Sequence, residues 1–168
     1  NPEFLEIRSV EDLDRCLEDH LIGIILYMEG LDCIGSDVRL LTALWELGVR
    51  GASLTWSRRN LLASGCCKAS ECYEIRGGLS PEGFDVVREV ERLRMFVDVS
   101  HLNDDGFENI RETAIRPFMA THSNSREVAF HYPNLTDTQM QILADQGGIA
   151  GLNGYVRLVS ETAEEESG

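Results

Sequence analysis

Three residues whose side chains can bind a metal ion each follow a short apolar run of the sequence. Glu29 lies at the end of GIILYMEG, His101 ends MFVDVSH, and His122 lies in FMATHS. Each run is typical of a buried β-strand, and the parallel strands of an α/β barrel all end on one face. A carboxylate and two imidazoles suit zinc, with cobalt or manganese as alternatives. The sequence therefore predicts half of a metal centre at that face.

This ligand set predicts hydrolytic chemistry. A catalytic zinc ion with three protein ligands keeps a position for water and lowers the pKa of that water to about 7. The zinc-bound hydroxide can then attack an amide carbonyl at neutral pH. A histidine at a strand end is often only a hydrogen-bonded core residue. Two histidines on consecutive strands, together with Glu29, favour the metal site.

Other polar residues are weaker candidates. His20 ends an expected helix, where a cation would favour the helix dipole, and His131 lies in the turn FHYPN. Asp98 precedes His101 in the same segment. We expect Asp98 either to orient a ligand through a hydrogen bond or to be a buried aspartate with partners inside the barrel.

The five cysteines predict reduced thiols and a cytoplasmic location, because their number is odd and the chain lacks the character of a small disulfide scaffold. Three of them lie in GCCKASEC, which lacks the paired C-x2-C spacing of a zinc knuckle, so we interpret Cys66, Cys67 and Cys72 as loop thiols. The sequence has no apolar run of about 18 residues, so we expect no membrane span.

The charge of the chain excludes some partners. Its 168 residues carry a formal net charge of −14, which argues against binding to nucleic acid or to an anionic membrane surface. We expect one globular unit over residues 5–158 and a solvated acidic tail over 159–168. The opening NPEF, residues 1–4, is interpreted as a cloning remnant or an internal start.

Apolar runs alternate with amphipathic stretches along the chain, which is typical of a parallel sheet covered by helices. Functional residues at successive strand ends, and the absence of a G-x-G-x-x-G motif, favour a (β/α)8 TIM-type barrel over an open sheet. A whole barrel needs eight strands and about 250 residues, so the chain is expected to carry about five strand–helix units. The predicted strands are Ile22–Met28, Gly51–Thr55, Met95–Ser100, Pro117–Thr121 and Ile149–Asn153.

Several motifs of the chain, in order and spacing, resemble the renal (membrane) dipeptidase family of zinc-dependent hydrolases. They include GIILYMEG, LGVRGASLTWSRRN, FVDVSH, ATHSNSREV and NLTDTQMQILADQGGIAGLNGY. The resemblance implies a (β/α)8 barrel with two zinc ions that hydrolyses dipeptides and tolerates a D-residue at the C-terminal position. It implies that Glu29 bridges the ions, that His101 and His122 complete the second zinc site, and that Trp56 and Tyr155 contact substrate.

The chain departs from the family pattern at several places. The family's H-x-D pair, which supplies the other zinc, does not occur in this sequence, and neither does the aspartate at the end of the last strand. We expect residues before Asn1 and after Gly168 to supply them. Trp56 stands where many members have histidine, and Pro133 stands where many have the arginine that grips the substrate carboxylate. Arg126 lies nearby in the sequence.

The sequence leaves three functions open. The leading hypothesis is a zinc-dependent dipeptidase acting on a dipeptide or small amide, with a homodimer as an option. The second is a non-catalytic or truncated homologue that binds a partner or serves a structural role. The third is another amidohydrolase-like metallohydrolase.

Overall fold

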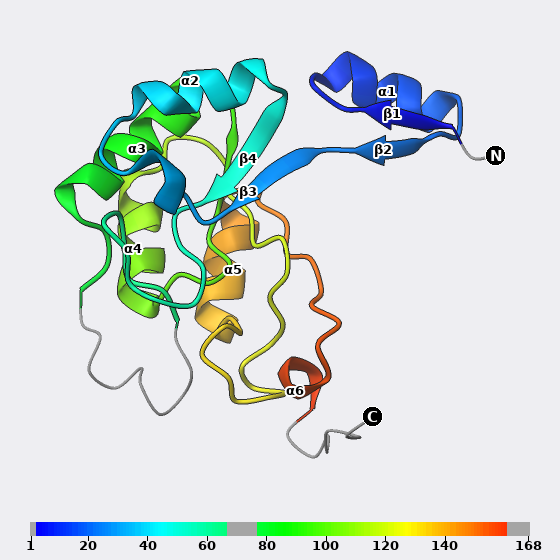
Figure 1. Cartoon of the computed structure of the whole chain (residues 1–168). Helices are drawn as coiled ribbons and strands as arrows, with labels where there is room; N and C mark the ends of the chain where they lie inside the picture. The colour runs from blue at the N-terminus through cyan, green and yellow to red at the C-terminus, as the bar shows by residue number, and fades with distance from the viewer. Residues whose placement is uncertain (1–2, 67–76, 161–168) are drawn as a thin grey trace, which may run out of the picture.

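The computed structural model describes residues 3–66 and 77–160 of the chain. Figure 1 shows helices α2, α3 and α4 gathered near the central strands, while β1, α1 and β2 extend to one side. In the described parts of the chain, no helix is long and apolar enough to cross a bilayer. The elements are β1 (Phe4–Glu6), α1 (Val10–Glu18), β2 (Ile22–Ile24), β3 (Leu26–Glu29), the 3-10 helix η1 (Asp32–Ile34), α2 (Arg39–Glu46), β4 (Val49–Ser53), α3 (Pro81–Arg92), β5 (Phe96–Asp98), α4 (Asp104–Thr113), α5 (Asp137–Asp145) and α6 (Val156–Val159).

The central sheet is parallel and brings strand ends from separate parts of the chain to one edge. Its order is β3–β4–β5, and its register places Glu29 level with Ser53 and Asp98. Segment 117–121 adds a parallel bridge to β5, and segment 149–153 adds another to segment 117–121. The α/β class and the parallel pairing are confirmed, and successive segments lie side by side in chain order.

Three strand predictions were wrong in extent. The segment predicted as Ile22–Met28 divides at Ile25 into β2, which pairs with β1 in a separate sheet, and β3, which pairs with β4. The segments predicted as strands Pro117–Thr121 and Ile149–Asn153 form single bridges. The sequence patterns also did not predict β1.

The Asp98 side chain accepts hydrogen bonds from backbone N–H groups at the point where pairing between β5 and segment 117–121 stops. Val99 N donates to Met119 O, but Thr121 N donates to Asp98 Oδ1 at 3.1 Å. Ser100 N donates to the same oxygen at 2.8 Å. Since each backbone N–H group is a single donor, these bonds to Asp98 replace the ladder bonds that a longer strand would need.

The helices begin and end at residues suited to those positions. Ser80 caps α3 with its side chain and is followed by Pro81, while Thr136 forms a capping box at the start of α5. Gly48 and Gly147 follow α2 and α5 with φ of 104° and 74°, which glycine adopts without steric cost.

An ion pair joins three segments near the C-terminal half of the chain. Arg126 donates two hydrogen bonds to the Asp104 carboxylate, at 2.8 and 2.9 Å. Gln139 Nε2, from α5, donates to the same carboxylate at 3.0 Å. The hydrogen bonds from Arg126 are the main cause that lowers the pKa of Asp104, so the pair stabilises the ionised form of this side chain.

Replacing Asp104 with asparagine should destabilise the protein in a pH-dependent way. The pKa of Asp104 is lower in the folded chain than its ordinary value of 3.8. Its contribution is therefore present above that pH and is lost as the pH falls through the folded-state value. Urea unfolding should show that Asp104→Asn lowers the free energy of unfolding more at pH 7 than at pH 3.

The matched control is Asp105→Asn, in the same turn of α4, where the carboxylate accepts a hydrogen bond from Gly77 N. We expect it to lower the free energy of unfolding at pH 7 less than Asp104→Asn does, because it keeps the ion pair between Arg126 and Asp104. An equal loss of stability at pH 7 and pH 3 for Asp104→Asn would contradict the role given to the ion pair.

Candidate metal centre

Glu29, His101 and His122 meet at the C-terminal ends of their segments. Nε2 of His101 lies 2.8 Å from Glu29 Oε1 and 2.8 Å from Nε2 of His122. Nε2 of His122 lies 3.2 Å from the same carboxylate oxygen. Among the described residues, these three make up the group of His, Cys, Asp and Glu side chains whose ligand atoms lie close enough to share one ion, all within 4.8 Å of one another.

His101 reaches this position through an unusual backbone conformation. Its φ is 68°, in the left-handed region, which costs a non-glycine residue about 1–3 kcal/mol and persists where its surroundings hold it. The His101 carbonyl accepts hydrogen bonds from Cys66 N at 2.7 Å and from Thr55 Oγ1 at 3.4 Å. These bonds hold the turn that aims the imidazole at Glu29.

Burial keeps the His101 imidazole neutral more readily than in water. Burial is the main cause that lowers the pKa of His101, the neighbouring His122 lowers it further, and Glu29 opposes both. A neutral imidazole is the form that binds a metal ion. The buried surroundings of His101 therefore favour its neutral, metal-binding form over its protonated form.

Asp98 lies fully buried behind the two histidines and accepts four hydrogen bonds. Its Oδ1 accepts from Ser100 N and Thr121 N. Its Oδ2 accepts from Tyr27 Oη at 2.6 Å and from Thr121 Oγ1 at 2.5 Å. Burial is the main cause that raises the pKa of Tyr27, and Asp98 raises it further, so Tyr27 remains a protonated donor. The expectation of a buried, hydrogen-bonded Asp98 is confirmed.

A pocket of about 600 Å³ opens beside the three converging side chains. Five lining residues were not among the sequence-based candidates. Tyr27 lies two residues before Glu29 on β3, so the alternation of side chains along a strand could have predicted it, and Thr121 directly precedes His122. No sequence signal pointed to the other three, Leu152, Asn153 and Gly154, which lie just beyond the bridge at Ala150. The lining residues are Tyr27, Glu29, Thr121, His122, Leu152, Asn153 and Gly154.

Trp56 and Tyr155, the two residues expected to contact substrate, differ in their position relative to the metal-binding group. Trp56 has an exposed fraction of 56%, and its ring centroid lies 6.2 Å from that of His101. Tyr155 is also exposed, at 52%, but it does not line the pocket beside Glu29. Trp56 is thus placed beside the converging side chains, and Tyr155 lies outside the pocket lining.

The weaker candidates do not join the cluster. His20 and His131 are absent from the metal-binding group found in residues 3–66 and 77–160. Arg126 is committed to Asp104 and to the carbonyls of Asn134 and Tyr132, so its guanidinium is not presented to a substrate.

The cysteine predictions are tested only in part. Cys16 and Cys33 form no disulfide with another described residue. Cys67 and Cys72 lie outside the described residues.

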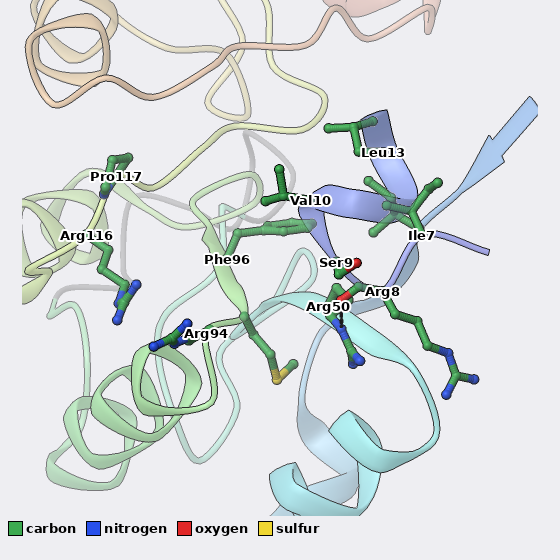
Figure 2. A pocket seen from close by; sticks show the side chains of 12 residues that line it. Ile7, Arg8, Ser9, Val10, Leu13, Arg50, Arg94, Phe96, Arg116 and Pro117 are labelled. Atoms are coloured by element: carbon green, nitrogen blue, oxygen red, sulfur yellow. Dashed lines mark hydrogen bonds between the residues drawn. The ribbon is translucent and has the colours of Figure 1, made fainter. Parts of the chain in front are cut away.

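A second pocket, of about 390 Å³, lies at the opposite ends of the strands. Arg50, Met95 and Phe96 line it from the first residues of β4 and the start of β5, and Arg94 and Arg116 lie along one side in Figure 2. None of the three converging ligand residues lines this pocket. The candidate metal-binding residues therefore belong to the C-terminal face alone.

Comparisons with known proteins agree with this geometry. The model of the membrane dipeptidase family (peptidase family M19) matches residues 1–166. An uncharacterised protein in the pqqA 5′ region of Klebsiella pneumoniae is 34% identical over 146 residues, which cover 86% of this chain and 54% of that protein. Dipeptidase aclJ of Aspergillus oryzae is 35% identical over 136 residues, which cover 80% of this chain and 31% of that protein.

A solved structure is similar over nearly the whole chain. It is a metallo peptidase from Rhodobacter sphaeroides, liganded with a phosphinate mimic of the dipeptide L-Ala-D-Ala. The TM-score is 0.88 at 31% identity, and the match covers 94% of this chain and 45% of that one. The chain thus spans about a third to a half of the length of these proteins. By sequence and by fold, it belongs to the membrane dipeptidase family, peptidase family M19.

Proposed function

We propose that the complete protein is a metal-dependent dipeptidase that hydrolyses the amide bond of dipeptides, including dipeptides with a C-terminal D-residue. One observation carries the proposal: Glu29 Oε1 and Nε2 of His101 and His122 converge from three separate segments. The dipeptide mimic bound by the Rhodobacter sphaeroides relative supports this substrate class.

The three side chains fit a divalent cation, and we propose that Glu29, His101 and His122 hold zinc. Two imidazole nitrogens and a carboxylate oxygen form a donor set typical of catalytic zinc sites. The half-exposed Glu29 carboxylate faces both imidazoles, so a divalent cation held by the two histidines would also lie within reach of a carboxylate oxygen. When bound, zinc polarises the amide carbonyl and acidifies a water molecule.

We propose that Glu29 bridges two zinc ions in the complete protein and that further ligands come from other parts of it. The family resemblance supports this arrangement, since it places an H-x-D pair on a strand that lies outside this sequence. Parallel segments that follow one another in chain order support a (β/α)8 barrel, of which residues 5–158 form about five units. The acidic tail over 159–168, a cytoplasmic location and a homodimer stay predictions.

The chain's own residues would bind and orient the substrate. The pocket beside Glu29 is about 600 Å³, within the range of about 300–1,000 Å³ that holds small ligands. Asn153 lies in its wall and donates to the His122 carbonyl at 3.3 Å. Trp56 lies beside His101 and is proposed to cover one side of a bound dipeptide, with Tyr155 as a second contact.

Replacing His101 with asparagine should remove metal and activity together. Asparagine tolerates the positive φ of His101, so the change removes the imidazole without adding backbone strain. In the complete protein, we expect zinc affinity and hydrolysis of L-Ala-D-Ala to fall by more than roughly 10–100-fold. That range is typical for loss of a residue that only hydrogen-bonds a metal ligand. Elemental analysis and a dipeptide hydrolysis assay measure the two quantities.

The matched control is His20→Asn. His20 is the other histidine with positive φ, at 53°, and it lies outside the cluster. Circular dichroism should show both variants folded. Unchanged zinc content and turnover in His101→Asn would reject His101 as a ligand.

Replacing Trp56 with alanine should weaken substrate binding and leave the metal in place. Loss of an aromatic contact of about 1 kcal/mol raises KM roughly fivefold, and we expect Trp56→Phe to keep most of the affinity. Steady-state kinetics with a dipeptide and elemental analysis separate the two effects. A KM equal to that of the unmodified protein would exclude Trp56 from the substrate site.

A further inference from the structure

The Thr121 hydroxyl links the buried Asp98 carboxylate to the imidazole of His122. Thr121 Oγ1 lies 2.5 Å from Asp98 Oδ2 and 2.7 Å from His122 Nδ1. Asp98 has an exposed fraction of 0%, and Tyr27 donates to the same carboxylate oxygen. One hydroxyl group therefore mediates between a carboxylate and the ring nitrogen that faces away from Glu29.

The single proton of this hydroxyl decides how the ring is protonated. The Asp98 carboxylate accepts hydrogen bonds from two backbone N–H groups and from Tyr27, and Thr121 Oγ1 donates its one proton to the same carboxylate. Its oxygen can then only accept from His122, and a neutral imidazole that donates through Nδ1 carries no proton on Nε2. The Nε2 lone pair is left facing Glu29 and His101, at 3.2 and 2.8 Å.

We propose that Asp98 and Thr121 are positioning residues that hold His122 in its Nδ1–H tautomer and thereby present Nε2 to a divalent cation. The role of this tautomer in metal binding rests on the proposed metal-dependent function. The tautomer itself is a property of the protein without metal. Outer partners of this kind fix ring orientation and typically change metal affinity by about 10–100-fold. Thr121 also lies in the wall of the pocket, so it ties the pocket wall to the ligand.

His101 provides a contrast within the same site. Its Nδ1 is buried, and it has no hydrogen-bond partner among the described residues. The orientation of His101 depends instead on its strained backbone turn and on Glu29. Thr121 contacts the ring of His122 directly, so its substitution should act first on the tautomer of His122 and reach His101 through the contact between the two Nε2 atoms.

The test uses the complete protein, stripped of metal with a chelator and labelled with 15N in its histidines. Long-range 1H–15N spectra, recorded where the imidazoles are neutral, report which nitrogen of each ring carries the proton. We expect Nδ1–H for His122. Thr121→Val removes the acceptor, and the ring should then populate the Nε2–H form, which can donate to Glu29. Thr121→Ser keeps the hydroxyl and should restore the unmodified pattern.

Zinc titration of the same proteins gives a second readout. We expect zinc affinity to fall by about 10–100-fold in Thr121→Val and to recover in Thr121→Ser. In Thr121→Ser, the spectra of both histidines should match those of the unmodified protein.

An Nε2–H tautomer for His122 in the unmodified protein would overturn the inference, because Thr121 would then be donating to the ring. The unmodified spectrum alone decides this, even if Thr121→Val fails to fold. An unchanged tautomer in folded Thr121→Val would also overturn it. An Nδ1–H tautomer in a protein that binds no zinc would support the tautomer assignment and reject the proposed metal-dependent function.

Discussion

The buried carboxylate of Asp98 is the interaction on which the geometry of the site depends. It accepts hydrogen bonds from Tyr27 on β3 and from Thr121 beyond the bridge to β5, and so links β5 to β3 across β4 and to segment 117–121. A buried charge is costly unless every acceptor position is used. Asp98 meets that condition with four donors, two of them backbone N–H groups whose use also ends the strand pairing.

The end of the strand pairing is what makes room for function. Since Thr121 N bonds Asp98, the pairing with β5 ends there, while Ser123 N still donates to Gly151 O on the other side. His122 follows Thr121 at once. His101 turns on the neighbouring segment through a left-handed conformation. Glu29 arrives from β3 two residues after Tyr27. The three side chains converge because the sheet ends at the same level in each segment, which is the general property of parallel α/β folds.

The sequence could predict the converging residues because they depend on few local facts. Apolar runs mark buried strands, and the residue that ends each run must lie at the common edge, so Glu29, His101 and His122 could be named from pattern alone. The break at Ile25 could not be predicted, because β2 and β3 form one continuous apolar run. The end of the strand pairing at Thr121 could also not be predicted. It depends on the Asp98 side chain of another strand, which accepts the hydrogen bond of Thr121 N.

Long-range contacts explain why the sequence did not predict the other pocket residues or the ion pair of Arg126. Tyr27 and Asn153 reach the pocket from segments 126 residues apart, and only the fold brings them together. Arg126 lies near Pro133 in the sequence, but its pairing with Asp104 needs α4 and could not be inferred from spacing.

The most direct measurement is X-ray diffraction from crystals of the complete protein with zinc, recorded on both sides of the zinc absorption edge. The account predicts an anomalous peak about 2.0–2.2 Å from Nε2 of His101, Nε2 of His122 and a carboxylate oxygen of Glu29. A peak at the cysteines of GCCKASEC with none between these three side chains would contradict it.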